Sequence, residues 1–121
     1  MIYTSYFARL KDLLSDITPI SICGKVPDFY TGLQYNKLAP KYDFFMKWKQ
    51  DHDNDSYIRS FKDQVLRPLN VYDVLSDLDS LSGGSGKIAL ICYEKPEDFC
   101  HRHIVAEWFR ANHVKCEEYK F

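Results

Sequence analysis

The sequence predicts an α/β fold: a single three-layer domain with a small, mostly parallel four-stranded sheet flanked by helices. Short apolar runs alternate along the chain with segments of helical periodicity, as in βαβ units. Residues 87–92 form a continuous apolar run of the kind found in strands covered on both faces of a parallel sheet. With 121 residues, 45% of them hydrophobic, the chain suffices for one compact core and is too short for two ordinary domains. We therefore expect residues 1–121 to form one domain.

The N-terminal part predicts a strand, a helix and a second strand. Residues 2–6 are aromatic and β-branched, as in a short strand. Apolar residues then recur at helical spacing over residues 7–17, and Pro19 ends that pattern. Residues 20–23 form a second apolar run that stops at Gly24. A βαβ unit is therefore expected at the start of the chain.

The middle of the chain predicts a long loop followed by helices. Residues 25–40 contain Pro, Gly, Asn and several tyrosines without a clear period, which indicates a loop. Helical spacing follows over residues 41–50, 54–66 and 70–81, with Asn70 as the N-cap of the last helix.

The C-terminal part predicts a second βαβ unit. The Ser-Gly-Gly-Ser-Gly turn at residues 82–86 leads into the strand 87–92. Pro96 suits the first turn of a helix, which we expect to run to Asn112, and residues 114–119 predict the last strand. Ligands of such sheets bind outside the carboxyl ends of the strands, so the segments after Tyr6, Cys23 and Cys92 should share one rim.

Composition excludes some classes of protein. The 16 basic and 17 acidic side chains nearly cancel, so no global field favours binding to nucleic acid or to a membrane surface. The N-terminus shows no charged leader before a long apolar run, and no segment approaches the roughly 18 apolar residues of a membrane span. We expect no membrane association and a cytoplasmic location. The four cysteines are then expected as thiols.

Residues 92–103, CYEKPEDFCHRH, concentrate reactive side chains. A helical projection places His101 in the apolar face, so its imidazole needs a hydrogen-bond partner, for which Glu94 or a backbone carbonyl is expected. His101 either ties this loop to the helix or takes part in catalysis or ligand binding. Cys100, near the helix start and beside Arg102, fits a thiol with a lowered pKa, although cysteine is also a common inert core residue.

The spacing of the cysteines and histidines argues against a metal site. Cys23, Cys92, Cys100 and His101 could supply a Cys₃His set, but seven residues separate the two nearest thiols, unlike the short Cys-x₂₋₄-Cys knuckles of structural zinc sites. A redox pair lacks the Cys-x-x-Cys spacing. The sequence therefore predicts no metal and no cofactor.

Two stretches carry a family resemblance. The apolar strand ending in Cys-Tyr-Glu-Lys, followed by Cys-His-Arg at residues 100–102, resembles the C-terminal signature of the domain-of-unknown-function family DUF488. The segment 38–40, Leu-Ala-Pro, followed by Trp48 and the helix from Tyr57, is similar to one branch of that family.

The resemblance implies a cytosolic α/β domain. It also implies a shared site at four residues: Glu94, Cys100, His101 and Arg102. The longer members carry an Asp-x-Arg type segment after the second strand, where this chain has Cys23-Gly24-Lys25. Lys25 would therefore replace a bidentate fork with a point charge.

Two functions were considered. The first is an enzyme, or former enzyme, that binds a phosphorylated or otherwise anionic small molecule, nucleotide-like, at the rim. Its proposed ligand-binding residues are Arg102, Lys25, Tyr6 and Tyr42. Cys100 or Glu94 would act as nucleophile or acid/base, with His101 as partner. The alternative is a non-catalytic module that binds nucleic acid or protein through the tyrosine-rich loop 28–42.

Overall fold

The computed structural model describes residues 1–121 and confirms an α/β fold with a parallel sheet flanked by helices. The sheet has five strands in the order β3-β2-β4-β1-β5, and every pairing is parallel. Its strands are β1 (Ile2–Tyr6), β2 (Thr18–Ser21), β3 (Leu33–Gln34), β4 (Ile88–Cys92) and β5 (Cys116–Glu118). The central position of β4 explains its apolar sequence, since all five of its residues are buried.

The fifth strand is the one that the sequence did not predict. β3 lies within the segment expected to be a loop and pairs with β2, Leu33 opposite Ile20 and Gln34 opposite Ser21. The buried Tyr30 donates its hydroxyl to the carbonyl of Leu33 and so fixes this edge. Two residues are too few to show the alternating pattern that identifies a strand, which is why this segment looks like a loop in the sequence.

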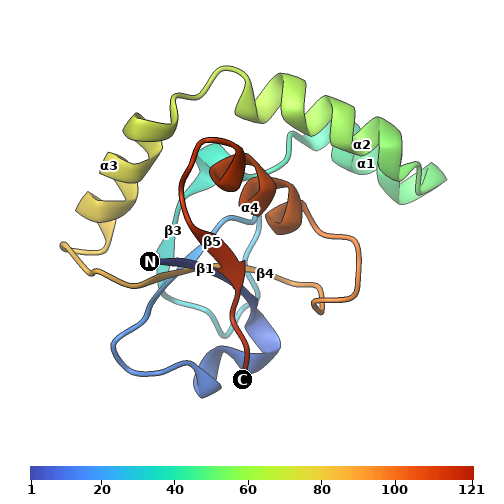
Figure 1. Cartoon of the computed structure of the whole chain (residues 1–121). Helices are drawn as coiled ribbons and strands as arrows, with labels where there is room; N and C mark the ends of the chain where they lie inside the picture. The colour runs from blue at the N-terminus through green and yellow to red at the C-terminus, as the bar shows by residue number, and fades with distance from the viewer.

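The helices are α1 (Tyr42–Asp51), α2 (Asn54–Phe61), α3 (Val71–Leu81) and α4 (His101–Ala111). A π-helical turn, η3 (Lys62–Leu66), continues α2, and a short 3₁₀ turn, η2 (Asn36–Leu38), precedes α1. The Asn70 side chain caps α3 by accepting from the backbone of Tyr72 and Asp73, as the sequence predicted. In Figure 1 the α-helices lie above the strands.

The prediction of a helix over residues 7–17 was wrong. This segment forms only a 3₁₀ turn, η1 (Phe7–Asp12), in which Arg9 departs from helical geometry (φ −112°, ψ 16°). Leu14, one of the residues that set the helical spacing, is 59% exposed, so no continuous apolar face is buried there. Without such a face, a short helix has little to stabilise it. In Figure 1, η1 lies below the strands.

The start of α4 also differs from the prediction. The helix begins at His101, with Cys100 as its N-cap, five residues later than Pro96. Lys95–Asp98 form a turn closed by a 3.0 Å hydrogen bond from the Asp98 N–H to the Lys95 carbonyl. Proline is favoured at the second position of such turns as well as in the first turn of a helix, so the same residue suits both structures.

The apolar face of α4 packs on the sheet and joins a core of 28 buried residues. Ile104, Val105 and Phe109 contribute this face. No helix is long and apolar enough to cross a membrane. Because β1, β2 and β4 run parallel, their carboxyl ends and the start of α4 meet at one rim, and the candidate site lies there.

Candidate functional site

Three thiols and one imidazole gather at the rim. Cys92 is the last residue of β4, Cys23 lies just after β2, and Cys100 and His101 open α4. All four side chains are buried, and no disulfide joins the cysteines. Segments as far apart in the sequence as Cys23 and His101 therefore supply one compact cluster, which we call the thiol–imidazole cluster.

The His101 ring is held by the backbone of the neighbouring strand end. Its Nε2 atom lies 2.7 Å from the carbonyl oxygen of Ile22, and a carbonyl can only accept, so Nε2 carries a proton and donates. Of the two partners expected from the sequence, Glu94 or a backbone carbonyl, the structure shows a carbonyl, and it comes from the segment after β2. With Nε2 protonated, the neutral ring has its lone pair on Nδ1, 3.8 Å from the sulfur of Cys92.

The cluster divides its thiols into two kinds. The side-chain contact with Cys92 lowers the pKa of Cys100, and nearby His101 and Arg102 lower it further, against the opposing effect of burial. The same contact with Cys92 lowers the pKa of Cys23. Burial, together with its two thiol neighbours, raises the pKa of Cys92 well above the usual value. These pKa directions favour a protonated thiol at Cys92 and a thiolate at Cys100.

A groove between α2 and α4 leads to Cys100. Its cavity has a volume of about 190 Å³. It is lined by Ile58, Lys62, Phe99, Cys100, His103, Ile104 and Glu107. Lys62 lies 3.7 Å from Glu107, and the ammonium remains half exposed. The Nε2 atom of His103 is buried without a hydrogen-bond partner. The groove therefore places a partly exposed Lys–Glu ion pair beside the cluster.

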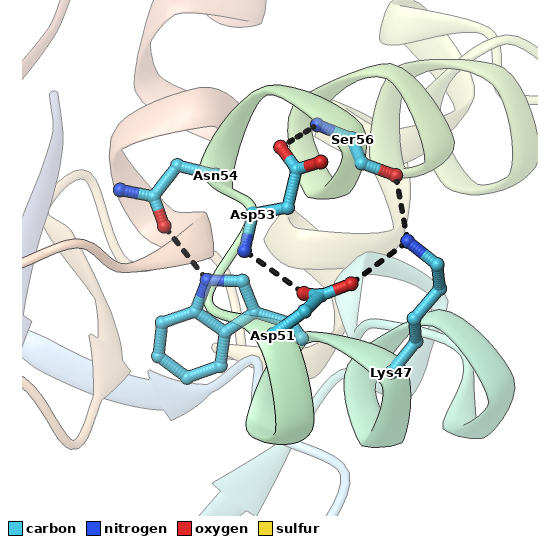
Figure 2. A network of polar contacts seen from close by, with 6 residues as sticks. Lys47, Asp51, Asp53, Asn54 and Ser56 are labelled. Atoms are coloured by element: carbon cyan, nitrogen blue, oxygen red, sulfur yellow. Dashed lines mark hydrogen bonds and ion pairs between the residues drawn. The ribbon is translucent and has the colours of Figure 1, made fainter.

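Phe99, which lines the groove, is supported by Trp48 near the turn between α1 and α2. Trp48 stacks on Phe99, the neighbour of Cys100, with ring centroids 5.5 Å apart and planes at 25°. The Trp48 indole N–H donates to Asn54 over 2.7 Å. Figure 2 shows how the turn is fixed around this contact. Asp53 caps α2 by accepting from the Ser56 N–H, and Asp51 accepts from both Lys47 and the Asp53 N–H.

The Arg102 side chain is fully buried, and its guanidinium is hydrogen-bonded within the protein. Its guanidinium makes two parallel 3.0 Å hydrogen bonds to Glu118 in β5 and donates to the Glu94 carbonyl over 2.7 Å. Thr4 donates to the same Glu118 carboxylate. The guanidinium also lies 5.7 Å above the Tyr6 ring. The guanidinium could bind an anionic ligand through two hydrogen bonds only if the Glu118 carboxylate were displaced.

The other predicted site residues lie on the surface of the rim or away from the cluster. Lys25 and Glu94 are exposed on the loops after β2 and β4, and Tyr93 donates its hydroxyl to the Lys25 carbonyl. Tyr42 opens α1 and is 73% exposed. Tyr30 and Tyr35 of the tyrosine-rich loop are buried and hydrogen-bonded, Tyr35 to Asp77 in α3.

Two side chains of the site were not predicted from the sequence: Lys62 and Glu118. Each has an ordinary helical or strand position, so no pattern distinguishes it. His103 lies in the reactive stretch 92–103, but no role was predicted for it. The π-helical hydrogen bond from the Arg67 N–H to the Lys62 carbonyl shows a local distortion that often accompanies functional sites, but it is visible only in the structure.

A family model described as the active DUF488-N3 subclade, DUF488-N3a, matches residues 7–113. The chain belongs to the DUF488 family. No curated protein and no solved structure matched it. The matched range of this DUF488 chain includes the whole thiol–imidazole cluster, Arg102 and the groove, whereas Tyr6 and Glu118 lie outside it. The partner of Arg102 is therefore supplied by a part of the chain that the family match does not cover.

Proposed function

We propose that this DUF488 chain is an enzyme, or former enzyme, that binds a phosphorylated or otherwise anionic small molecule, nucleotide-like, at the rim of the sheet. Cys100 is the nucleophile and His101 its partner. The observation that carries the proposal is the position of the Cys100 thiol, at the start of α4, against Cys92 and His101 and in the wall of an open groove. Reactive cysteines occupy such electropositive helix starts.

The groove is suited to an anion. No side chain caps α4, so amide groups of its first turn are free of a side-chain partner. Lys62 brings a positive charge to the same space, where Glu107 lies 3.7 Å from it, and His103 also lines the groove. In this arrangement Arg102 is a positioning residue that acts through Glu118 and packs over Tyr6. Lys25 and Glu94 approach a ligand from the rim loops.

The description of the matching family model agrees with the proposal of an enzyme. The matching family model is described as an active subclade. That description concerns the family. In this chain, the chemical support for an enzyme is the buried thiol of Cys100 beside the imidazole of His101.

The test is thermal stability of metal-free protein with nucleotides, sugar phosphates and inorganic phosphate, followed by a turnover screen on any ligand that binds. Lys62→Ala should reduce the stabilisation by an anionic ligand. Cys100→Ser should retain ligand binding and abolish turnover. Cys116→Ser is the matched control, because Cys116 is equally buried but lies in β5 outside the cluster.

Two results would count against the proposal. Full turnover by Cys100→Ser would remove the cysteine nucleophile. A well-folded protein that no anionic ligand stabilises would remove the ligand class and favour the non-catalytic module with residues 28–42 as its binding segment.

A further inference from the structure

The thiol–imidazole cluster contains a set of metal-ligand atoms. One ligand atom each from Cys23, Cys92 and His101 lies within 4.8 Å of the other two, and all three residues are buried. The sequence argued against a metal because its nearest thiols do not form a knuckle. That spacing rule does not apply to this set, since its members come from two strand ends and a helix start and meet only in the fold.

The distances suit a tetrahedral ion. Zinc bonds of about 2.3 Å to sulfur and about 2.0–2.1 Å to nitrogen give an edge of about 3.6 Å between a sulfur and a nitrogen ligand. The Cys92 sulfur lies 3.8 Å from Nδ1 of His101, the ring nitrogen that the Ile22 hydrogen bond leaves free. Only a small contraction of the three-residue set is needed to reach such distances.

The surroundings of His101 match those of a metal ligand. A ligating imidazole usually donates its second N–H to a carboxylate or a backbone carbonyl, which fixes the tautomer and the ring orientation. His101 already donates Nε2–H to the Ile22 carbonyl, which leaves the Nδ1 lone pair free for an ion. The Cys23 backbone is held as well, because its N–H donates to the Ser21 hydroxyl over 3.2 Å.

A metal could enter beside Cys23. Gly24 and Lys25, which follow it directly, are both exposed. Two thiolates and a neutral imidazole would balance the charge of a divalent ion, as required in an otherwise apolar pocket.

We propose that Cys23, Cys92 and His101 form a binding site for a thiophilic divalent cation of the zinc type. Three protein ligands leave one coordination position for water or a ligand, the arrangement of catalytic rather than structural zinc sites. Cys100 is not one of the three. His101 serves both proposals, but Cys100→Ser separates them, because it removes the proposed nucleophile and leaves all three metal ligands in place.

The test is titration of metal-free, reduced protein with Co²⁺ and Zn²⁺. We expect one equivalent of Co²⁺ to give tetrahedral ligand-field bands with sulfur-to-cobalt charge transfer, and Zn²⁺ to displace it. Cys23→Ser, Cys92→Ser and His101→Gln should each weaken Zn²⁺ binding by at least about a hundredfold, since loss of an outer-sphere partner alone costs about 10–100-fold. Cys100→Ser and Cys116→Ser should keep the site.

A second measurement needs no variant and so is unaffected by misfolding. One equivalent of Zn²⁺ should protect Cys23 and Cys92 from alkylation, read by mass spectrometry, and leave Cys116 unchanged. The absence of a cobalt spectrum, a spectrum that survives in all three ligand variants, or rapid formation of a Cys23–Cys92 disulfide with no metal uptake would overturn the proposal.

Discussion

The guanidinium of Arg102 and the carboxylate of Glu118 meet through two parallel hydrogen bonds, from Nε to Oε1 and from Nη2 to Oε2, each 3.0 Å long. The Arg102 side chain is fully buried, and that of Glu118 is 23% exposed. This pair connects α4 with β5, and through the Glu94 carbonyl and Thr4 it also connects the β4 loop and β1. The start of α4, and Cys100 with it, is therefore positioned by the far edge of the sheet.

Glu118→Gln tests this connection. The substitution removes the negative charge and leaves a buried cation with a neutral partner, so we expect a loss of about 1.5–3 kcal/mol in the free energy of unfolding, the range for hydrogen bonds to charged groups. Denaturant titration measures it. Glu117→Gln is the matched control. The Glu117 side chain is exposed, so this substitution should change the free energy of unfolding by less than about 0.5 kcal/mol. Equal effects of the two variants would contradict a structural role for the pair.

Trp48 should control access to Cys100. Trp48→Ala removes the ring stacked on Phe99, so we expect faster alkylation of Cys100 by iodoacetamide and a stability loss of about 2–4 kcal/mol. Trp48→Phe keeps an aromatic ring but loses the indole hydrogen bond to Asn54, so it should cost about 1 kcal/mol. Alkylation of Cys116 provides the internal reference, because burial raises its pKa to about 11. A Cys100 rate that is identical in both Trp48 variants and the parent would show that the stack does not cover the thiol.

The cap of α2 gives a prediction for the turn shown in Figure 2. Asp53→Ala leaves the Ser56 N–H without its acceptor, and we expect about 1 kcal/mol of destabilisation. Asp53→Ser retains a capping oxygen and should recover most of that loss. Thermal unfolding of the two variants side by side measures the difference. If serine is no better than alanine, the cap does not stabilise the helix.

Asp77 gives a pH dependence of stability. The Tyr35 hydroxyl, and after it the ammonium of Lys37, lower the pKa of Asp77 in the folded chain. A depressed folded-state pKa contributes stability above the unfolded pKa of about 4, and the contribution disappears as the pH falls through the folded value. The parent should therefore be more stable than Asp77→Asn near pH 7, with the gap closing below about pH 4. Asp79→Asn is the control, and a gap that persists in acid would refute the linkage.

Most of the fold could be predicted from the sequence because its strongest elements carry long or simple patterns. The apolar run of β4 and the spacing and Asn70 cap of α3 are of this kind. β3 is too short for any pattern, and η1 has helical spacing without a buried face. The start of α4 was misplaced because Pro96 suits a turn as well as a helix.

The candidate site was harder to predict than the fold. The concentration of reactive side chains in residues 92–103 was evident, and so was the resemblance to DUF488 that the family match confirms. The partners of these residues were not evident, because they lie far away along the chain: Ile22 for His101 and Glu118 for Arg102. The spacing of residues along the sequence cannot predict these contacts, because they form only when the parallel sheet brings distant segments together.

The strand order has a consequence for how the chain folds. β1 and β2 do not pair with each other; each pairs with β4, which lies between them and follows them by more than sixty residues of sequence. Until β4 is available, the two earlier strands have no central neighbour, and closing the sheet requires contacts of long sequence separation, which are slow to form. During synthesis the first two thirds of the chain should therefore stay without a sheet core, and the rim with its cysteines can assemble only in the last step, when residues 88–101 emerge.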